Sequence, residues 1–118
     1  IAQCLVGSEM CIRDRYKMSE IIKDIIEAGS LIKNDRTLKD VMIKVAEETG
    51  EIAQVVSMIT GHTTYKTGQE GLAGEIADLI IAAVDLGRLY YDGEDFEKIL
   101  ANKVECKINK WKEKYDRV

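Results

Sequence analysis

Two pairs of acidic residues stand at helical spacing in the middle of this chain: Glu48 with Glu51, and Glu75 with Asp78. Residues three apart lie on one face of a helix, about one turn apart. If the two helices pack together, four carboxylates converge, and four like charges are untenable unless a cation neutralises them. A hard divalent ion such as Mg²⁺ takes oxygen ligands and keeps waters for substrate phosphates. We therefore expect these residues to hold Mg²⁺, or Mn²⁺, in a metal-dependent hydrolase.

Two other interpretations of the acidic pairs are weaker. Either pair alone is typical of solvated acids on a Glu- and Lys-rich helix, but Asp78 precedes the apolar run 79–84, where an unpaired carboxylate would cost several kcal/mol. A ferritin-like di-iron site also uses carboxylates of a helical bundle, but it requires Glu-x-x-His pairs. The one histidine, His62, falls in an expected loop. A site for a hard divalent ion remains the favoured interpretation.

The elements that must position these acids are predicted to be helices. Apolar residues recur at three- and four-residue steps, and the chain has no proline, which predicts helices over 19–33, 38–60, 72–91 and 94–115. Thr37-x-x-Asp40 resembles a capping box, and the Gly- and Thr-rich residues 60–71 predict a loop. We expect an all-α, antiparallel four-helix bundle-like domain, completed by oligomerisation, with the third helix at its centre. Several residues of the second and fourth helices are expected to point inward, among them Leu38, Met42, Val56, Ile59 and Trp111.

The first 17 residues are interpreted as lying outside the domain. Residues 5–14 (LVGSEMCIRD) match the translation of a transposase-type sequencing adapter, so we treat 1–15 as an artefact and Met18 as the expected start. The alternative, an apolar N-terminal extension or signal peptide, lacks a basic region and a long enough apolar run. The domain then comprises 18–118, a length that is marginal for a monomer and favours a homodimer or homotetramer.

Composition limits the partners and the compartment. The formal net charge of −4 and the absence of a basic run argue against binding to nucleic acid. Cys4 and Cys11 lie in the discarded stretch, so Cys106 is expected to make no disulfide within the chain, which favours a reducing compartment. No apolar run approaches the length of a membrane span. We expect a soluble cytoplasmic protein that binds neither nucleic acid nor membrane.

The acidic pairs and their flanks resemble the MazG-like branch of the all-α nucleotide pyrophosphohydrolases. That superfamily is marked by ExxE followed by ExxD, which appear here within KVAEETGEIAQ and EIADLIIAAV. The likeness extends to NDRTLKDV before the first motif and to KINKW at 107–111, so it covers about residues 31–112. The chain departs from the family where a Lys-x-x-x-Asn pattern is common in the last helix, because Lys107 replaces the Asn after Lys103. It also has one such domain where the prototype branch commonly has two.

The resemblance implies hydrolysis of a nucleoside or deoxynucleoside triphosphate to the monophosphate and pyrophosphate. By position, Glu48, Glu51, Glu75 and Asp78 would hold Mg²⁺, which can lower the pKa of a bound water. Glu47, or one of the ligands Glu48 and Glu51, is then a candidate to position or deprotonate that water. Phosphates also need cations beyond the metal. The candidates are Lys44, Lys66, Lys103, Lys107 and Lys110.

Two alternatives keep the fold and change the function. The substrate could be another phosphoanhydride, such as phosphoribosyl-ATP, or the chain could be a non-catalytic helical regulatory or interaction module that retains the acids structurally. In the second case Glu48→Gln and Asp78→Asn would raise thermal stability, and Mg²⁺ would leave melting unchanged. Asp85, two turns beyond Asp78, is expected to pair with a cation and is assigned no chemistry.

Overall fold

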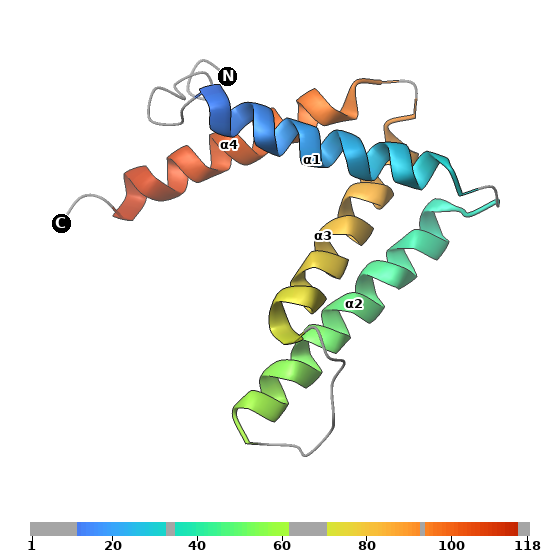
Figure 1. Ribbon diagram of the computed structural model, residues 1–118, viewed down its shortest axis with the longest axis vertical. Helices are drawn as coiled ribbons and strands as arrows, with labels where there is room; N and C mark the ends of the chain where they lie inside the picture. Colours follow the sequence, from blue (N-terminus) through green and yellow to red (C-terminus); the bar gives the residue numbers. More distant parts are fainter. Residues whose placement is uncertain (1–11, 33–34, 62–70, 93, 116–118) are drawn as a thin grey trace.

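The structure is a computed structural model, and it describes residues 12–32, 35–61, 71–92 and 94–115. These residues form four helices and no strand: α1 (Ile12–Ser30), α2 (Leu38–Ile59), α3 (Gly71–Tyr90) and α4 (Phe96–Tyr115) (Figure 1). The predicted all-α class is confirmed, and most predicted helix ends differ from the observed ones by three residues or fewer. The exception is α1, which begins at Ile12, inside the stretch interpreted as lying outside the domain.

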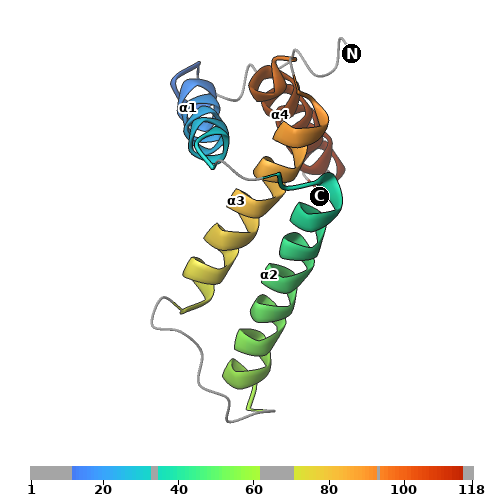
Figure 2. The same cartoon turned by 90° about the vertical axis from the view of Figure 1, so that its right-hand side faces the viewer.

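The helices are arranged as two antiparallel pairs set across each other, as Figures 1 and 2 show. Helices α2 and α3 pack along one another, and α1 packs against α4 and against the end of α3 nearest to it. We call these pairs the α2·α3 arm and the α1·α4 arm. The helices do pack together as expected, but one protomer contains two helix pairs and no common four-helix core.

The two-arm arrangement makes the molecule open. Its radius of gyration is 16.8 Å and its principal extents are 47 × 46 × 23 Å, whereas a compact domain of this length would have a radius of gyration of about 13.5 Å. A chain of this size that spreads its helices into two arms leaves much of their apolar surface uncovered.

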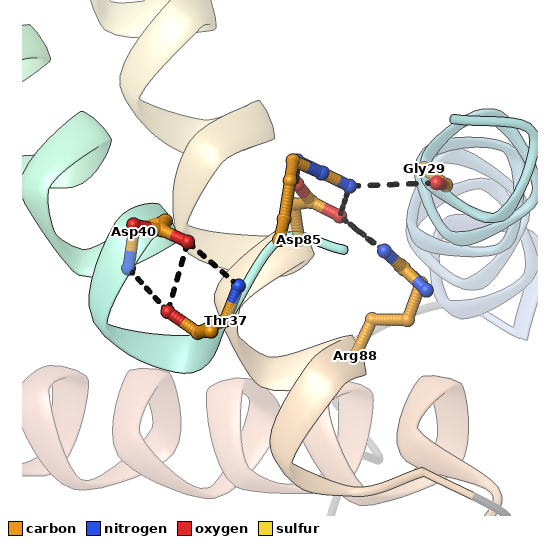
Figure 3. Close-up of polar contacts among 6 residues, drawn as sticks. Gly29, Thr37, Asp40, Asp85 and Arg88 are labelled. Atoms are coloured by element: carbon orange, nitrogen blue, oxygen red, sulfur yellow. Dashed lines mark hydrogen bonds and ion pairs between the residues drawn. The ribbon is translucent and has the colours of Figure 1, made fainter. Parts of the chain in front are cut away.

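Helix α2 begins at the predicted capping box (Figure 3). The Asp40 backbone N–H donates to Thr37 Oγ1 at 3.1 Å, and the Thr37 backbone N–H donates to Asp40 Oδ2 at 2.9 Å. These hydrogen bonds lower the pKa of Asp40, the one from the Thr37 backbone most of all. The motif provides hydrogen-bond partners for backbone N–H groups at the start of α2 that have none within the helix. It also fixes the position of Thr37, and therefore of the backbone of Arg36 just before it.

The two arms are joined by an apolar cluster of Ile22 from α1, Val84 from α3 and Phe96 from α4. The Tyr91 ring stacks on the Phe96 ring, with 5.1 Å between the ring centroids. The Phe96 ring also lies against the backbone of Gly87 on α3. Glycine is required there because a Cβ atom would lie 2.1 Å from the ring. The joint therefore depends on close approach of an aromatic ring to the α3 backbone.

Several residues predicted to be buried are exposed in the protomer. On α2 the exposed fractions are 44% for Leu38 and 63% for Ile59, and Trp111 on α4 is 68% exposed. Helix α3 contacts α2 along its length and packs at one end against α1 and the Phe96 ring of α4, so it touches all three other helices, but one flank of the α2·α3 arm is left uncovered. The other apolar residues left exposed on the α2·α3 arm are Met42, Ile43, Val56, Ile76, Ile80, Ile81 and Tyr90.

Cys106 differs from expectation. It is buried and disulfide-bonded. The prediction that this cysteine makes no bond within the chain is wrong, and cysteine usage therefore gives no support to a reducing compartment. Over the part of the chain that the structure describes, no helix has the length and apolar character needed to cross a membrane.

Candidate metal centre

The four predicted metal ligands lie together on the α2·α3 arm. Glu48 and Glu51 come from the middle of α2, and Glu75 and Asp78 come from the first two turns of α3, which runs antiparallel to it. Each residue offers one carboxylate oxygen, and these four oxygens lie within 4.8 Å of one another. The predicted convergence of the two acidic pairs is confirmed.

This donor set fits a hard divalent cation. Opposite ligands of an octahedral Mg²⁺ lie about 4.2 Å apart, because each Mg–O bond is about 2.1 Å long. The observed upper limit of 4.8 Å exceeds that value only slightly, so small side-chain rotations would bring all four oxygens onto one ion. All four donors are carboxylates, which Mg²⁺, Mn²⁺ and Ca²⁺ prefer over softer ligands.

Two buried oxygens in this cluster lack hydrogen-bond partners. Glu48 is only 4% exposed, and Oε2 of Glu48 and Oε2 of Glu75 are both buried without a partner. A buried polar atom without a partner costs about 1–3 kcal/mol, and more when it carries charge. A cation among the four carboxylates would remove that cost at both atoms.

The carboxylates also affect one another's protonation. Hydrogen bonding to Glu75, and then the negative charge of Glu48, raise the pKa of Glu51 above its ordinary value. Without a cation, Glu51 therefore releases its proton at a higher pH than an isolated glutamate does. A divalent cation in the cluster would oppose this shift by favouring the charged carboxylates.

Of the predicted phosphate-binding lysines that the structure describes, Lys44 alone lies beside the cluster. Its Nζ is 2.9 Å from Glu48 Oε1 and 3.9 Å from Glu47 Oε2. The hydrogen bond to Glu48 is the main cause of a raised Lys44 pKa, so this side chain stays positively charged. Glu48 thus uses one oxygen for Lys44 and has the other available for a cation.

The remaining predicted residues lie elsewhere. The Glu47 side chain is 60% exposed and is not one of the four clustered acids. Lys66 lies outside the described residues. Lys103, Lys107 and Lys110 are exposed on α4, in the α1·α4 arm, whereas the cluster occupies the opposite end of α3 (Figure 1). Within one protomer the fold does not bring the α4 lysines to the acidic cluster.

The structure adds two arginines that sequence reasoning missed. Asp85, 8% exposed, pairs with Arg36 Nη1 at 2.5 Å and with Arg88 Nε at 3.0 Å (Figure 3). Burial alone would raise the pKa of Asp85, but the hydrogen bonds and charges of Arg36 and Arg88 outweigh it and lower the pKa. The expected cation partner of Asp85 is thus confirmed. Arg88 could have been found from its three-residue spacing, while Arg36 is distant in sequence.

A cavity of about 320 Å³ connects these two groups of charges. Glu48 and Asp78 line it on the side of the acidic cluster, and Arg36, Asp85 and Lys44 also contribute to its wall. Ile81 and Ala82 of α3 complete the lining. The acidic cluster therefore opens onto a cavity that is partly open to solvent and also carries positive charge.

Comparison of this chain with protein-family models, with curated proteins and with solved structures gave no match. The case for the site therefore depends on its geometry and on the sequence motifs that place the four carboxylates.

Proposed function

We propose that this protein is a Mg²⁺-dependent nucleoside triphosphate pyrophosphohydrolase. The observation that carries the proposal is the group of four carboxylates within 4.8 Å, two of which contain buried oxygens without partners. The order ExxE then ExxD, with its flanking residues, supports the choice of a nucleotide as substrate through the resemblance described above. The cavity beside the cluster, with its arginine and lysine side chains, suits an anionic substrate.

In this proposal Glu48, Glu51, Glu75 and Asp78 hold the ion. The ion supplies charge neutralisation at the phosphate oxygens and a bound water of lowered pKa. Lys44 stays protonated next to Glu48 and presents a positive charge at the rim of the cluster. Glu47, exposed on the same turn of α2, is the candidate that accepts the proton of the attacking water.

The experiment is product analysis across canonical and modified nucleotides with Mg²⁺. We expect pyrophosphate and the monophosphate in equal amounts from at least one nucleotide, and a loss of at least about a hundredfold in Glu48→Gln and in Asp78→Asn, because each removes a metal ligand. Glu20→Gln, an exposed acid on α1, is the control and should keep full activity. No product from any nucleotide, with metal binding intact, would overturn the proposal.

Thermal melting separates this function from a non-catalytic module. At a Mg²⁺ concentration a hundred times its dissociation constant, the ion should stabilise the wild type by about 2.7 kcal/mol. A module that retains its acids only structurally would melt at the same temperature with and without Mg²⁺. A phosphoribosyl-ATP substrate would instead appear as selective hydrolysis of that compound.

Self-association is part of the same proposal. Leu38 and Met42 of α2 and Leu86 and Tyr90 of α3 line an open apolar groove of about 720 Å³. On the helical repeat Val56 extends this stripe along α2, on the flank of the arm away from Lys44 and Glu51. We propose that a second copy of the chain covers this face in a homodimer, which completes a bundle that one protomer lacks.

A further inference from the structure

The cavity of about 320 Å³ on the α2·α3 arm has an acidic end and a basic end. At the acidic end, Glu48 and Asp78 belong to the four-carboxylate cluster. At the basic end, Asp85 forms ion pairs with both Arg36 and Arg88. Asp78 and Asp85 are two helical turns apart, which is about 10 Å along α3. A ligand that spans the cavity would therefore contact carboxylates at one end and the Arg36 guanidinium at the other.

The basic end carries more positive charge than Asp85 needs. Arg88 reaches Asp85 Oδ1 with both Nε and Nη2, each at 3.0 Å, so that this arginine alone can neutralise the carboxylate. Arg36 pairs with Asp85 Oδ2 as well, so one carboxylate serves two guanidinium groups and the network carries one net positive charge. The Arg36 side chain is 22% exposed and lines the cavity, where a bound anion would balance that charge.

The acidic end shows the opposite need. Glu48 lines the cavity, is 4% exposed, and has an oxygen without a partner. Arg88 neutralises Asp85, so the remaining charges of the lining are Arg36 and Lys44 against Glu48 and Asp78, and they balance. Glu51 and Glu75 make the lining and the acidic cluster together negative by two charges. A bound divalent ion would offset these charges, so an anion would bind more strongly with the ion than without it.

We infer that this cavity binds the phosphate chain of a metal-bound polyphosphate, with the metal at Glu48 and Asp78 and a terminal phosphate against the Arg36 guanidinium. Arg36 suits that role because its planar guanidinium can donate two parallel hydrogen bonds to one phosphate. Asp85 would remain paired with Arg88 when Arg36 binds the ligand. This inference depends on the metal site of the proposed function, and it adds a phosphate-binding residue from the segment between α1 and α2.

Binding of inorganic pyrophosphate, measured by calorimetry, tests the inference without any hydrolysis. The wild type should bind pyrophosphate in Mg²⁺ and at least about tenfold more weakly in EDTA, because the lining and the acidic cluster together are negative without the ion. Arg36→Gln should weaken pyrophosphate binding at least about tenfold, the effect of losing a charge-assisted contact, at an unchanged affinity for Mg²⁺ alone. Lys39→Gln, an exposed α2 position outside the cavity, is the control and should bind as the wild type does.

Helical circular dichroism shows whether Arg36→Gln is folded. If it is not, Arg36→Lys, which keeps the charge but loses the fork, and Lys44→Gln, at a side chain that is 58% exposed, take its place with the same expected weakening. Equal pyrophosphate affinity in the folded variants and the wild type, or binding that does not depend on Mg²⁺, would overturn the inference.

The two proposals fail in different ways. Nucleotide hydrolysis by a protein whose pyrophosphate binding is indifferent to Arg36 would overturn the inference and leave the proposed function standing. Pyrophosphate binding that depends on Mg²⁺ and on Arg36, in a protein that hydrolyses no nucleotide, would overturn the proposed function and support the cavity as a polyphosphate site.

Discussion

At the scale of single residues, Glu51 connects the acidic cluster to the stability of the fold. Its pKa is raised by hydrogen bonding to Glu75 and by the charge of Glu48. A carboxyl whose pKa is higher in the folded state favours folding at pH values below its unfolded pKa, near 4.5. That contribution is lost as the pH rises through the raised folded-state value. In the metal-free protein, the contribution of Glu51 to the free energy of unfolding should therefore fall as the pH rises through this interval.

Glu51→Gln tests this dependence. Between pH 4.5 and pH 7, we expect the melting temperature of the metal-free wild type to fall relative to that of the variant, because glutamine cannot ionise. Adding Mg²⁺ at pH 7 should raise the melting temperature of the wild type and have little effect on the variant. Scanning calorimetry across the pH series gives both results.

Glu47→Gln is the control for that series, since it removes one α2 acid outside the cluster. Asp40 and Asp85 have lowered pKa values and give the opposite pH trend, so the comparison uses the difference between each variant and the wild type. Parallel profiles for the wild type and Glu51→Gln would contradict the assignment.

The residues of the site were predictable to different degrees. The four carboxylates could be predicted because their spacing of three residues on two helices needs only an antiparallel pairing to converge. Arg36 could not be predicted as a neighbour of Asp85, because 49 residues separate the two in sequence and their contact depends on how the α1–α2 connection crosses α3. The α4 lysines failed to join the site for the same reason, since their position depends on the arrangement of the arms.

At the scale of helices, two glycines inside helices should respond to alanine in opposite ways. A Cβ atom at Gly87 would lie 2.1 Å from the Phe96 ring, and such overpacking costs about 1–3 kcal/mol. A Cβ atom at Gly50, between Glu48 and Glu51, would meet nothing within 4 Å. Gly50→Ala should therefore stabilise α2 by about 0.5–1 kcal/mol.

Urea unfolding followed by circular dichroism measures both glycine variants. Gly87→Ala is expected to lower the free energy of unfolding and Gly50→Ala to raise it. Equal shifts in the two variants would mean that helix propensity alone determines the outcome, and that the contact between Gly87 and Phe96 does not hold the arms together.

Helix positions were largely predictable, and the angle between the arms was not. Apolar periodicity and the Thr37 capping box locate α2 because both signals are local in the sequence. The angle at which the arms cross depends on contacts between residues that are distant in sequence. Examples are the Phe96 ring on Gly87 and the close approach of Gly29 to Asp85. Gly29 has no local signal, yet a Cβ there would lie 2.5 Å from the Asp85 carboxylate.

At the scale of the whole molecule, the exposed face of the α2·α3 arm should be an interface. A standard interface buries about 800 Å² per partner, and the exposed side chains of Leu38, Met42, Ile43 and Tyr90, which line one groove, would form the apolar centre of such an interface. Met42→Lys places a charge in the groove and should weaken the dimer at least about tenfold, because an unpaired charge would be buried.

Light scattering coupled to size-exclusion chromatography measures the mass over a range of protein concentrations. Leu31→Lys, at a residue that is 75% exposed at the end of α1, is the control and should leave the mass unchanged. A wild type that stays monomeric at every concentration would contradict the proposed dimer.

The sequence could not show whether the apolar faces are covered within the chain. Periodicity identifies which face of α2 and of α3 is apolar. It does not show whether the helix that covers this face belongs to the same chain or to another copy of it. The sequence-based prediction is a bundle completed by oligomerisation with α3 at its centre, and it leaves open whether a single chain could close that bundle. The radius of gyration of 16.8 Å shows that it does not.

The apolar cluster at the joint between the arms has members from α1, α3 and α4, and no described residue of α2 belongs to it. Local unfolding proceeds in contiguous cooperative units, and here α2 lies outside the unit that joins the other three helices. Transient detachment of α2 would separate Glu48 and Glu51 from Glu75 and Asp78 while that joint persisted. A cation held by the acidic cluster would then lengthen the lifetime of the α2–α3 pairing, because its ligands come from both helices.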